Sequence, residues 1–178
     1  MKNDSGVKQV IFVLETNDSA RTDTRYIIKL WDQLYGINNN EIKRQFVHMD
    51  GKTKYNKNQV ISKIKSYIRA NSDGKNYVVY CFDTDRIDTS SIDLNNIKTY
   101  KKYCEDHNYQ FVWFCYDIEM VFIGRSISDA EKEKASKNFS RIKDMIDVNK
   151  LKCGNEIEDM HKEKSNIFTV LNEIHKIA

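Results

Sequence analysis

The sequence predicts a doubly wound α/β fold built on a mainly parallel, four-stranded sheet. Four short and largely apolar runs, at residues 8–14, 43–49, 77–82 and 109–116, have the length and composition of strands. The segments between them have apolar residues at helical spacing, so strands and helices alternate along the chain. Such an order with short links is typical of a parallel sheet with right-handed crossovers and helices on both faces. The simplest doubly wound arrangement has the strand order 2-1-3-4.

The first strand, residues 8–14, ends at Glu15. A polar loop follows, in which Thr22 or Asp23 is placed to cap the next helix. Apolar residues then recur at helical spacing until Gly36, which ends this helix.

The second strand, residues 43–49, has a weaker pattern and ends at a turn signal formed by Asp50 and Gly51. Residues 52–69 contain six basic side chains and no acidic one. Their apolar positions predict an amphipathic helix whose solvated face is positive; these positions are Val60, Ile61, Ile64, Tyr67 and Ile68. Residues 71–74 end this helix.

The third strand has the clearest pattern, because residues 77–82 are apolar, aromatic or β-branched without a break. Such a run is typical of a strand that is covered on both faces. It stops at Asp83, and Asp85 follows two positions later. A helix over about residues 93–107 and a fourth strand at residues 109–116 come next.

Beyond the sheet, the character of the sequence changes. We expect an α/β domain at residues 1–125 and a helical extension at residues 126–178 that packs on the same domain. Ser165 is placed to cap the last helix, and residues 151–164 are polar and expected to form a loop. The apolar residues at helical spacing in the extension are Ala135, Phe139, Ile142 and Ile146, followed by Ile167, Val170, Leu171, Ile174 and Ile177. The extension thus supplies two or three helices that cover the sheet or form a small lid.

The composition of the 178 residues, with 40% hydrophobic and 31% charged side chains, is typical of a globular protein with a sizeable core. A net charge of +3 does not by itself imply a nucleic-acid partner. No apolar run is long enough to cross a bilayer and no signal-peptide pattern is present, so we expect a cytoplasmic protein without a membrane partner. The four cysteines are scattered, which favours reduced thiols over disulfides or a zinc site. Glycine-rich nucleotide-binding motifs are absent.

Carboxylates follow two strands that the predicted order sets side by side. Glu15 follows the first strand, whereas Asp83 and Asp85 follow the third. Ligands of α/β sheets bind outside the carboxyl ends of the strands, so these side chains are expected to lie together at a binding site. Oxygen ligands of this kind bind Mg²⁺ or Mn²⁺, and such a cation can polarise a phosphodiester. Asp at a strand end also caps helices and closes turns, so a purely structural role stays open.

A glutamate after the first strand and D-x-D after the third resemble the signature of the Toprim domain, a Rossmann-like fold. Among Toprim proteins the chain looks most like the stand-alone RloB-like proteins, which are associated with restriction and phage-defence loci. The likeness covers residues 8–125 and includes the segment FDTD at residues 82–85 and the apolar stretch DIEMVFIG at residues 117–124. The family usually has a glycine after the first glutamate, where this chain has Thr16, and an S-N-P segment that this chain lacks.

The resemblance implies roles for the acidic residues. Glu15 would serve as general acid/base or metal ligand, and Asp83 and Asp85 would hold Mg²⁺ or Mn²⁺. Asp117 and Glu119 are candidates for a further ligand or for orienting lysines. An acid on the first turn of a helix is also favoured by the helix dipole alone, so a structural role is the alternative for these two.

A basic surface is the candidate nucleic-acid contact. Its lysines are Lys63, Lys65, Lys98, Lys101 and Lys102, which can track a phosphate backbone. Three tyrosines, Tyr55, Tyr100 and Tyr103, are candidates for stacking on bases. A run of lysines is also the ordinary composition of a solvated helix face.

Two functions are therefore expected from the sequence. The first is a metal-dependent phosphodiester hydrolase or nucleotidyl-transfer protein, such as a Mg²⁺- or Mn²⁺-dependent nuclease, acting on nucleic acid or nucleotides in phage defence or restriction. The second is a non-catalytic Toprim-like module that binds a partner protein, encoded in the same defence operon, or a nucleotide signal. The departures from the family motif favour the second function.

Overall fold

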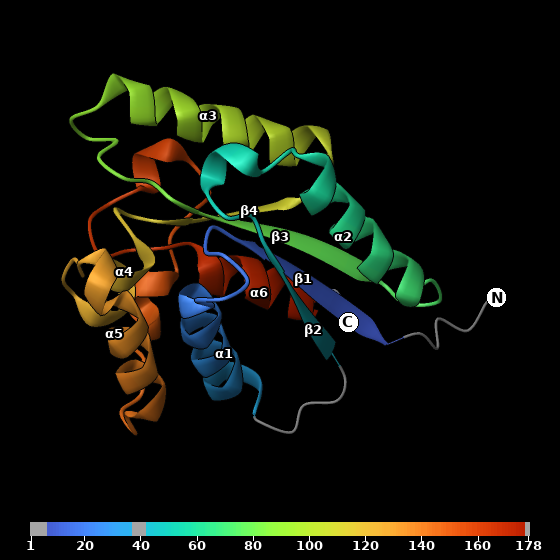
Figure 1. Ribbon diagram of the computed structural model, residues 1–178, viewed down its shortest axis with the longest axis horizontal. Helices are drawn as coiled ribbons and strands as arrows, with labels where there is room; N and C mark the ends of the chain where they lie inside the picture. The colour runs from blue at the N-terminus through green and yellow to red at the C-terminus, as the bar shows by residue number, and fades with distance from the viewer. Residues whose placement is uncertain (1–6, 37–41, 177–178) are drawn as a thin grey trace.

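The four strands form one parallel sheet in the order β2-β1-β3-β4, as the sequence predicts (Figure 1). This computed structural model describes residues 7–36 and 42–176 of the chain. The strands are β1 (Lys8–Leu14), β2 (Ile42–His48), β3 (Asn76–Asp83) and β4 (Gln110–Phe114). Because β1 and β3 are neighbours, their carboxyl ends meet at the centre of one edge of the sheet.

Helices cover both faces of the sheet, which confirms the doubly wound prediction (Figure 1). One face carries α1 (Thr22–Tyr35), α4 (Ile118–Ile123), α5 (Asp129–Arg141) and α6 (Ile167–Lys176). The other face carries α2 (Asn58–Ala70) and α3 (Ser91–Asp106).

Side chains of the central strands alternate between two hydrophobic cores. Along β1, Phe12 and Leu14 pack under α1, whereas Ile11 and Val13 pack on the side of α2 and α3. This period of two arises from the pleat of the strand, and both sets are buried because both faces are covered. The unbroken apolar run of the sequence is explained in the same way.

The four cysteines lie within the described part of the chain, and none of them forms a disulfide bond. The cysteines are free thiols, and only Cys153 among them is partly exposed. Across residues 7–36 and 42–176, no helix combines the length and the apolar character that a bilayer span requires.

The start of α1 differs from the prediction that Thr22 or Asp23 caps it. The residue before the helix is Arg21, which has a left-handed backbone (φ 49°) and makes no side-chain cap, and the two predicted residues lie buried in the first turn. Asn17 organises the loop instead, because its side-chain oxygen accepts the backbone N–H groups of Ser19 and Ala20 at 3.1 and 2.8 Å. Asp23 does not cap the helix, and its carboxylate accepts the hydroxyl group of Thr22 at 3.2 Å.

The helix predicted to reach Ile146 is also shorter, since α5 ends at Arg141. Two side chains of α1 bind the backbone that follows it. Lys29 donates to the carbonyl oxygens of Phe139, at 3.0 Å, and of Ile142. Gln33 accepts the N–H of Ile146 at 2.6 Å and donates to its carbonyl oxygen at 2.9 Å. These contacts hold the chain in an extended course that the local sequence does not encode.

The remaining segments are short turns. Single 3₁₀ turns occur at η1 (Lys52–Lys54), η2 (Val148–Leu151) and η3 (Ile157–Asp159), the last within the predicted loop at residues 151–164. The stretch at residues 117–124 forms α4, and Gly124 ends it with a positive φ of 83°. The predicted last helix includes Ile177, which lies outside the described residues.

The segment before α6 completes the hydrogen bonding of the edge strand β4. Asn166 is buried, accepts the N–H of Trp113 at 3.0 Å and donates to the carbonyl oxygen of Phe111 at 2.9 Å. Ser165, predicted as a cap, donates to the carbonyl oxygen of Trp113 at 2.6 Å and accepts the N–H of Ile167 at 3.1 Å. These side chains take the place of a fifth strand.

The change Asn166→Ala should therefore destabilise the protein by about 2 kcal/mol, because two buried backbone groups lose their partners. Thermal and urea unfolding measure this loss. Asn138→Ala, an exposed change on α5, is the matched control and should have little effect. Equal stability of the two variants would contradict the role assigned to Asn166.

Candidate functional site

Carboxylates gather at the edge of the sheet where β1 and β3 end. Glu15 follows β1, and its Oε1 accepts the backbone N–H of Asp83 at 2.8 Å. Asp83 is the last residue of β3, and its Oδ1 accepts the backbone N–H of Ile118 at 3.0 Å. The structure thus brings together Glu15 and Asp83, which the strand order predicts to be neighbours.

Asp85 is joined to this pair through a lysine. Its carboxylate forms an ion pair with Lys52, whose Nζ also donates to the carbonyl oxygen of Asp83 at 3.3 Å. The backbone of Asp85 is left-handed (φ 52°) and its N–H donates to the carbonyl oxygen of Tyr116 at 2.9 Å. The lysine thus links the carboxylate of Asp85 to the backbone carbonyl oxygen of Asp83, and its charge offsets that of Asp85.

The turn after β2 positions Lys52. The N–H of Asp50 donates to the carbonyl oxygen of Thr16 at 3.3 Å, and the N–H of Gly51 donates to that of Glu15 at 2.8 Å. Gly51 has φ 108°, a conformation that side-chain-bearing residues rarely adopt. The Asp-Gly pair that the sequence marks as a turn therefore fastens Lys52 beside the end of β1.

A second group of acids lies toward α4 and α5. Glu119 is fully buried on α4, and neither of its carboxylate oxygens has a hydrogen-bond partner. The buried hydroxyl group of Tyr26 is likewise without one. Lys132 of α5 approaches Glu119 at 3.8 Å. Asp117 instead caps α4, since its Oδ1 accepts the N–H of Met120 at 2.6 Å.

A pocket of about 450 Å³ opens beside Glu15 and Asp83. Its walls come from the loop between β1 and α1, the turn after β2, the end of β3 and the first turn of α5. The lining side chains that carry charge are Glu15, Asp23, Asp50, Asp83, Asp129, Lys132 and Glu133. Carboxylates outnumber the lysine, so the pocket favours a cation over an anion.

Burial and mutual repulsion raise the pKa values of four carboxyl groups at this edge of the sheet, those of Glu15, Asp23, Asp83 and Glu119. Burial raises the pKa of Glu15 to about 8, although Lys52 and the hydrogen bond from Asp83 oppose the shift. Burial likewise raises the pKa of Asp23 to about 6 and that of Glu119 to about 7. The pKa of Asp83 rises well above its ordinary range because of burial and then the charge of Glu15. Some of these carboxyl groups therefore stay protonated near neutral pH unless a bound cation offsets their negative charge.

The donor set fits a hard divalent cation, because it consists of oxygen atoms, and those of Glu119 are unpartnered. Among the residues that the structure describes, however, no three His, Cys, Asp or Glu side chains are arranged to hold a metal ion. The carboxylates of Glu15 and Asp83 face backbone N–H groups, and that of Asp85 faces Lys52. Binding of a cation would require some of these contacts to exchange.

The predicted nucleic-acid lysines lie on α2 and α3, which share one face of the sheet (Figure 1). Three of them have acidic partners: Lys63 with Asp18, Lys101 with Glu105 and Glu156, and Lys102 with Asp106. Lys65 and Lys98 are exposed, and no ion pair involves them within the described residues. Of the predicted tyrosines, Tyr100 is buried and stacks on Phe82 with ring centroids 4.6 Å apart, so its ring is not open to a base.

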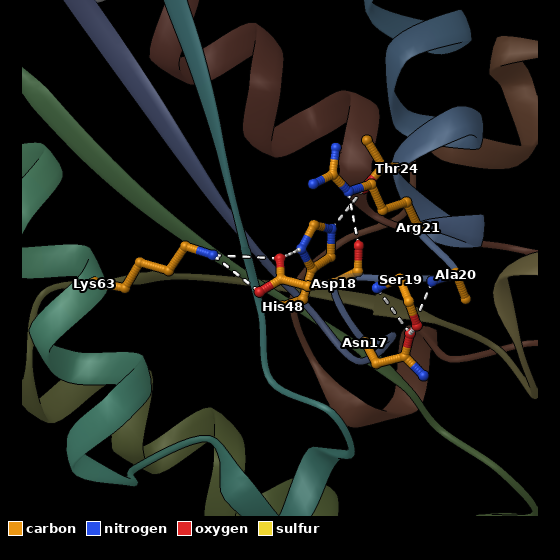
Figure 2. A network of polar contacts seen from close by, with 8 residues as sticks. All are labelled: Asn17, Asp18, Ser19, Ala20, Arg21, Thr24, His48 and Lys63. Carbon is orange, nitrogen blue, oxygen red and sulfur yellow. Dashed lines mark hydrogen bonds and ion pairs between the residues drawn. The ribbon is translucent and has the colours of Figure 1, made fainter.

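Figure 2 shows the polar network that fixes the loop between β1 and α1. Asp18 accepts from Nδ1 of His48 at 2.6 Å and from Lys63 at 3.3 Å, and Nε2 of His48 lies 2.9 Å from the hydroxyl group of Thr24. An ionised carboxylate only accepts hydrogen bonds, so His48 donates from Nδ1 and accepts the Thr24 hydroxyl at Nε2. Burial lowers the pKa of His48, which keeps the ring neutral. The network thus fixes one wall of the acidic pocket.

Three charged residues of the site escaped the sequence analysis as site residues: Asp23, Lys52 and Lys132. Asp23 stands near the predicted start of a helix, where an acidic residue indicates a helix cap rather than a binding site. Lys52 follows the Asp-Gly turn, yet the contact with Asp85 spans 33 residues. Lys132 lies on α5, and no pattern in the sequence predicts that this helix packs beside the pocket.

Comparison of the chain with protein-family models, with curated proteins and with solved structures gives no match. The chemistry of this edge of the sheet is therefore inferred from its own side chains.

The raised pKa values predict that the metal-free protein loses stability as the pH rises. Glu119 ionises near pH 4.5 in the unfolded chain, whereas its pKa in the folded state is about 7. Below both pKa values the Glu119 carboxyl group is protonated in the folded and in the unfolded state, so it does not change the free energy of unfolding. Between the two pKa values only the unfolded chain releases the proton, so the free energy of unfolding falls as the pH rises. Asp23 and Glu15 act in the same direction. Thermal unfolding without divalent cations, from about pH 5 to about pH 8, should show a falling Tm.

The change Glu119→Gln removes one of these ionisations. We expect it to raise the Tm by about 5 °C at pH 8 and to change it little at pH 5. Glu158→Gln, which alters an exposed glutamate, is the matched control and should leave both values unchanged. If Glu119→Gln lowers the Tm by the same amount at both pH values, ionisation of the buried Glu119 does not destabilise the folded protein, and the prediction is wrong.

Proposed function

We propose that the protein is a Mg²⁺- or Mn²⁺-dependent, Toprim-like phosphodiester hydrolase or nucleotidyl-transfer protein that acts on nucleic acid or nucleotides. The observation that carries the proposal is the contact of Glu15 with Asp83 within a group of buried carboxylates at the carboxyl edge of a parallel sheet. Buried acids that repel one another are costly for stability, and such strain is characteristic of functional sites. The resemblance to RloB-like proteins adds a role in phage defence or restriction, with a partner protein from the same operon.

Glu15, Asp83 and Asp85 are the residues that would hold the cation, with Asp117 and Glu119 as further acids of the site. The cation supplies charge that polarises the phosphodiester and offsets the negative charge of the transition state. Glu15, whose pKa is about 8, is suited to accept a proton from the attacking water or to return one to the leaving oxygen. Lys132 is placed at the pocket wall, where its ammonium group can bind a phosphate oxygen.

The change Asp83→Ala tests this function. Cleavage or nucleotidyl transfer by the wild-type protein should require Mg²⁺ or Mn²⁺, and the variant should lose more than about 100-fold in rate because a ligand is removed. Gel assays on single- and double-stranded DNA and RNA measure both. Asp73→Ala, at an exposed turn, is the matched control. Metal-dependent cleavage that survives in Asp83→Ala would mean that the activity resides elsewhere.

A non-catalytic Toprim-like module is the second candidate, and the ion pair of Lys52 with Asp85 favours it, because the lysine already supplies a positive charge at this place. Such a module would bind a partner protein or a nucleotide signal without chemistry. Calorimetry with Mn²⁺ separates the two functions. Binding that disappears in the double variant Asp83→Asn, Asp85→Asn supports the enzyme, whereas a wild-type protein that binds no Mn²⁺ supports the module.

Nucleic-acid binding is expected to depend on the lysines of α2 and α3. Lys65 and Lys98 are the sharpest test, since both are exposed and free of ion pairs within the described part of the chain. The double change Lys65→Glu, Lys98→Glu should weaken the binding of an oligonucleotide and lower the slope of log affinity against log salt by about 1 for each lost phosphate contact. Fluorescence anisotropy at several salt concentrations measures this.

The control for that experiment is the double change Lys134→Glu, Lys143→Glu. It makes the same change in net charge at exposed positions in and after α5, on the other face of the sheet. Equal losses in the two double variants would indicate that only the net charge matters and would remove the α2–α3 surface as the contact.

A further inference from the structure

Lys52 pairs directly with Asp85, one of the three proposed ligands of the cation. Its Nζ contacts the carboxylate of Asp85 and the carbonyl oxygen of Asp83. The side chain of Lys52 is only 21% exposed, and that of Asp85 is 45% exposed. The lysine is therefore part of the site rather than a surface residue that drifts near it.

The backbone holds this lysine in place. Gly51, directly before it, is hydrogen-bonded to the carbonyl oxygen of Glu15, and the 3₁₀ turn η1 begins at Lys52 itself. The same turn therefore fixes the lysine to the strand that carries the first carboxylate. Its approach to Asp85 follows from the fold and not from the helical surface of α2.

An ammonium group and a divalent cation compete for the same carboxylate oxygens. While Asp85 is paired with Lys52, its carboxylate is not available as a metal ligand. Lys132, the lysine that lines the pocket, differs, because it lies 3.8 Å from Glu119 and 3.6 Å from the exposed Asp129 and makes no hydrogen bond to either. Lys52 is thus the cation that engages the D-x-D segment directly.

We propose that Lys52 is a resident counter-ion that a divalent cation must displace from Asp85 before the carboxylates of Glu15, Asp83 and Asp85 can act as one set of ligands. The inference rests on the proposed function in that it assumes a cation at this site. It adds that the affinity for that cation is held down by a residue of the chain, so that the site is filled only when the cation concentration is high enough to displace the lysine.

Calorimetric titration of the metal-free protein with Mn²⁺ tests the proposal through affinity alone. Lys52→Met keeps the length of the side chain and removes its charge, so it should bind Mn²⁺ about tenfold or more tightly than the wild-type protein. Lys52→Arg keeps the charge and should retain the wild-type affinity. Lys57→Met removes an equal charge from an exposed lysine five residues away that forms no ion pair within the described residues, and it should change the affinity little.

A double-mutant cycle with Asp85→Asn shows whether the gain passes through Asp85. In that background, Lys52→Met should lose most of its tenfold effect, because the carboxylate for which lysine and cation compete is gone. Circular dichroism and thermal unfolding confirm that each variant is folded. An equal gain with and without Asp85 would overturn the proposal, since the lysine would then act only through the general field of the pocket.

The outcomes also separate this proposal from the proposed function. If Mn²⁺ binds the wild-type protein, is lost in Asp83→Asn and is not tightened by Lys52→Met, the counter-ion role is wrong and the metal site stands. If neither the wild-type protein nor Lys52→Met binds Mn²⁺, both fail. If Lys52→Met binds Mn²⁺ and the wild-type protein does not, the counter-ion role is supported, whereas the wild-type protein itself is the non-catalytic module rather than the enzyme.

Discussion

Repulsion between buried carboxylates at the ends of β1 and β3 is the constraint around which this structure is organised. The parallel pairing of these strands brings Glu15 against Asp83, and burial makes each negative charge expensive. The surrounding chain offsets the charge with backbone N–H groups, those of Asp83 and Ile118. Each of these donors comes from an element that is itself fixed by the sheet or by the start of α4.

Two lysines from different elements complete this balance. Lys52 reaches the site from the turn after β2, and Lys132 reaches it from α5. Burial alone would lower the pKa of Lys52, but Glu15 and Asp85 raise it overall, so the lysine stays charged. Glu119 is left without a hydrogen bond in spite of the nearby lysine. A site that keeps unpartnered acid in its interior gives up stability, which natural proteins tolerate mainly where function requires it.

The sheet could be predicted from the sequence because its signals are local. Unbroken apolar runs such as residues 77–82 identify buried strands, and alternation with helices fixes their parallel direction. Glu15 and Asp83 could be predicted as neighbours for the same reason, since strand order alone brings them together. The end of α5 could not be predicted, because Lys29 and Gln33 of another helix determine it.

The parts of the site that escaped prediction depend on contacts between distant segments. Asp23 faces the pocket because Asn17 and Arg21 shape the preceding loop, and Lys52 reaches Asp85 because Gly51 bonds to Glu15. Neither arrangement leaves a periodic pattern in the sequence. Charged residues in loops therefore need the tertiary structure before a role can be assigned, whereas the acids at strand ends do not.

The most direct measurement of the central claim is a crystal structure of the protein soaked in Mn²⁺, with data collected at a wavelength where manganese scatters anomalously. The account predicts an anomalous peak at the carboxyl edge of the sheet, coordinated by Glu15 and Asp83, with Asp85 turned from Lys52 toward the ion. An empty edge with Lys52 still paired to Asp85 at saturating Mn²⁺ would contradict it.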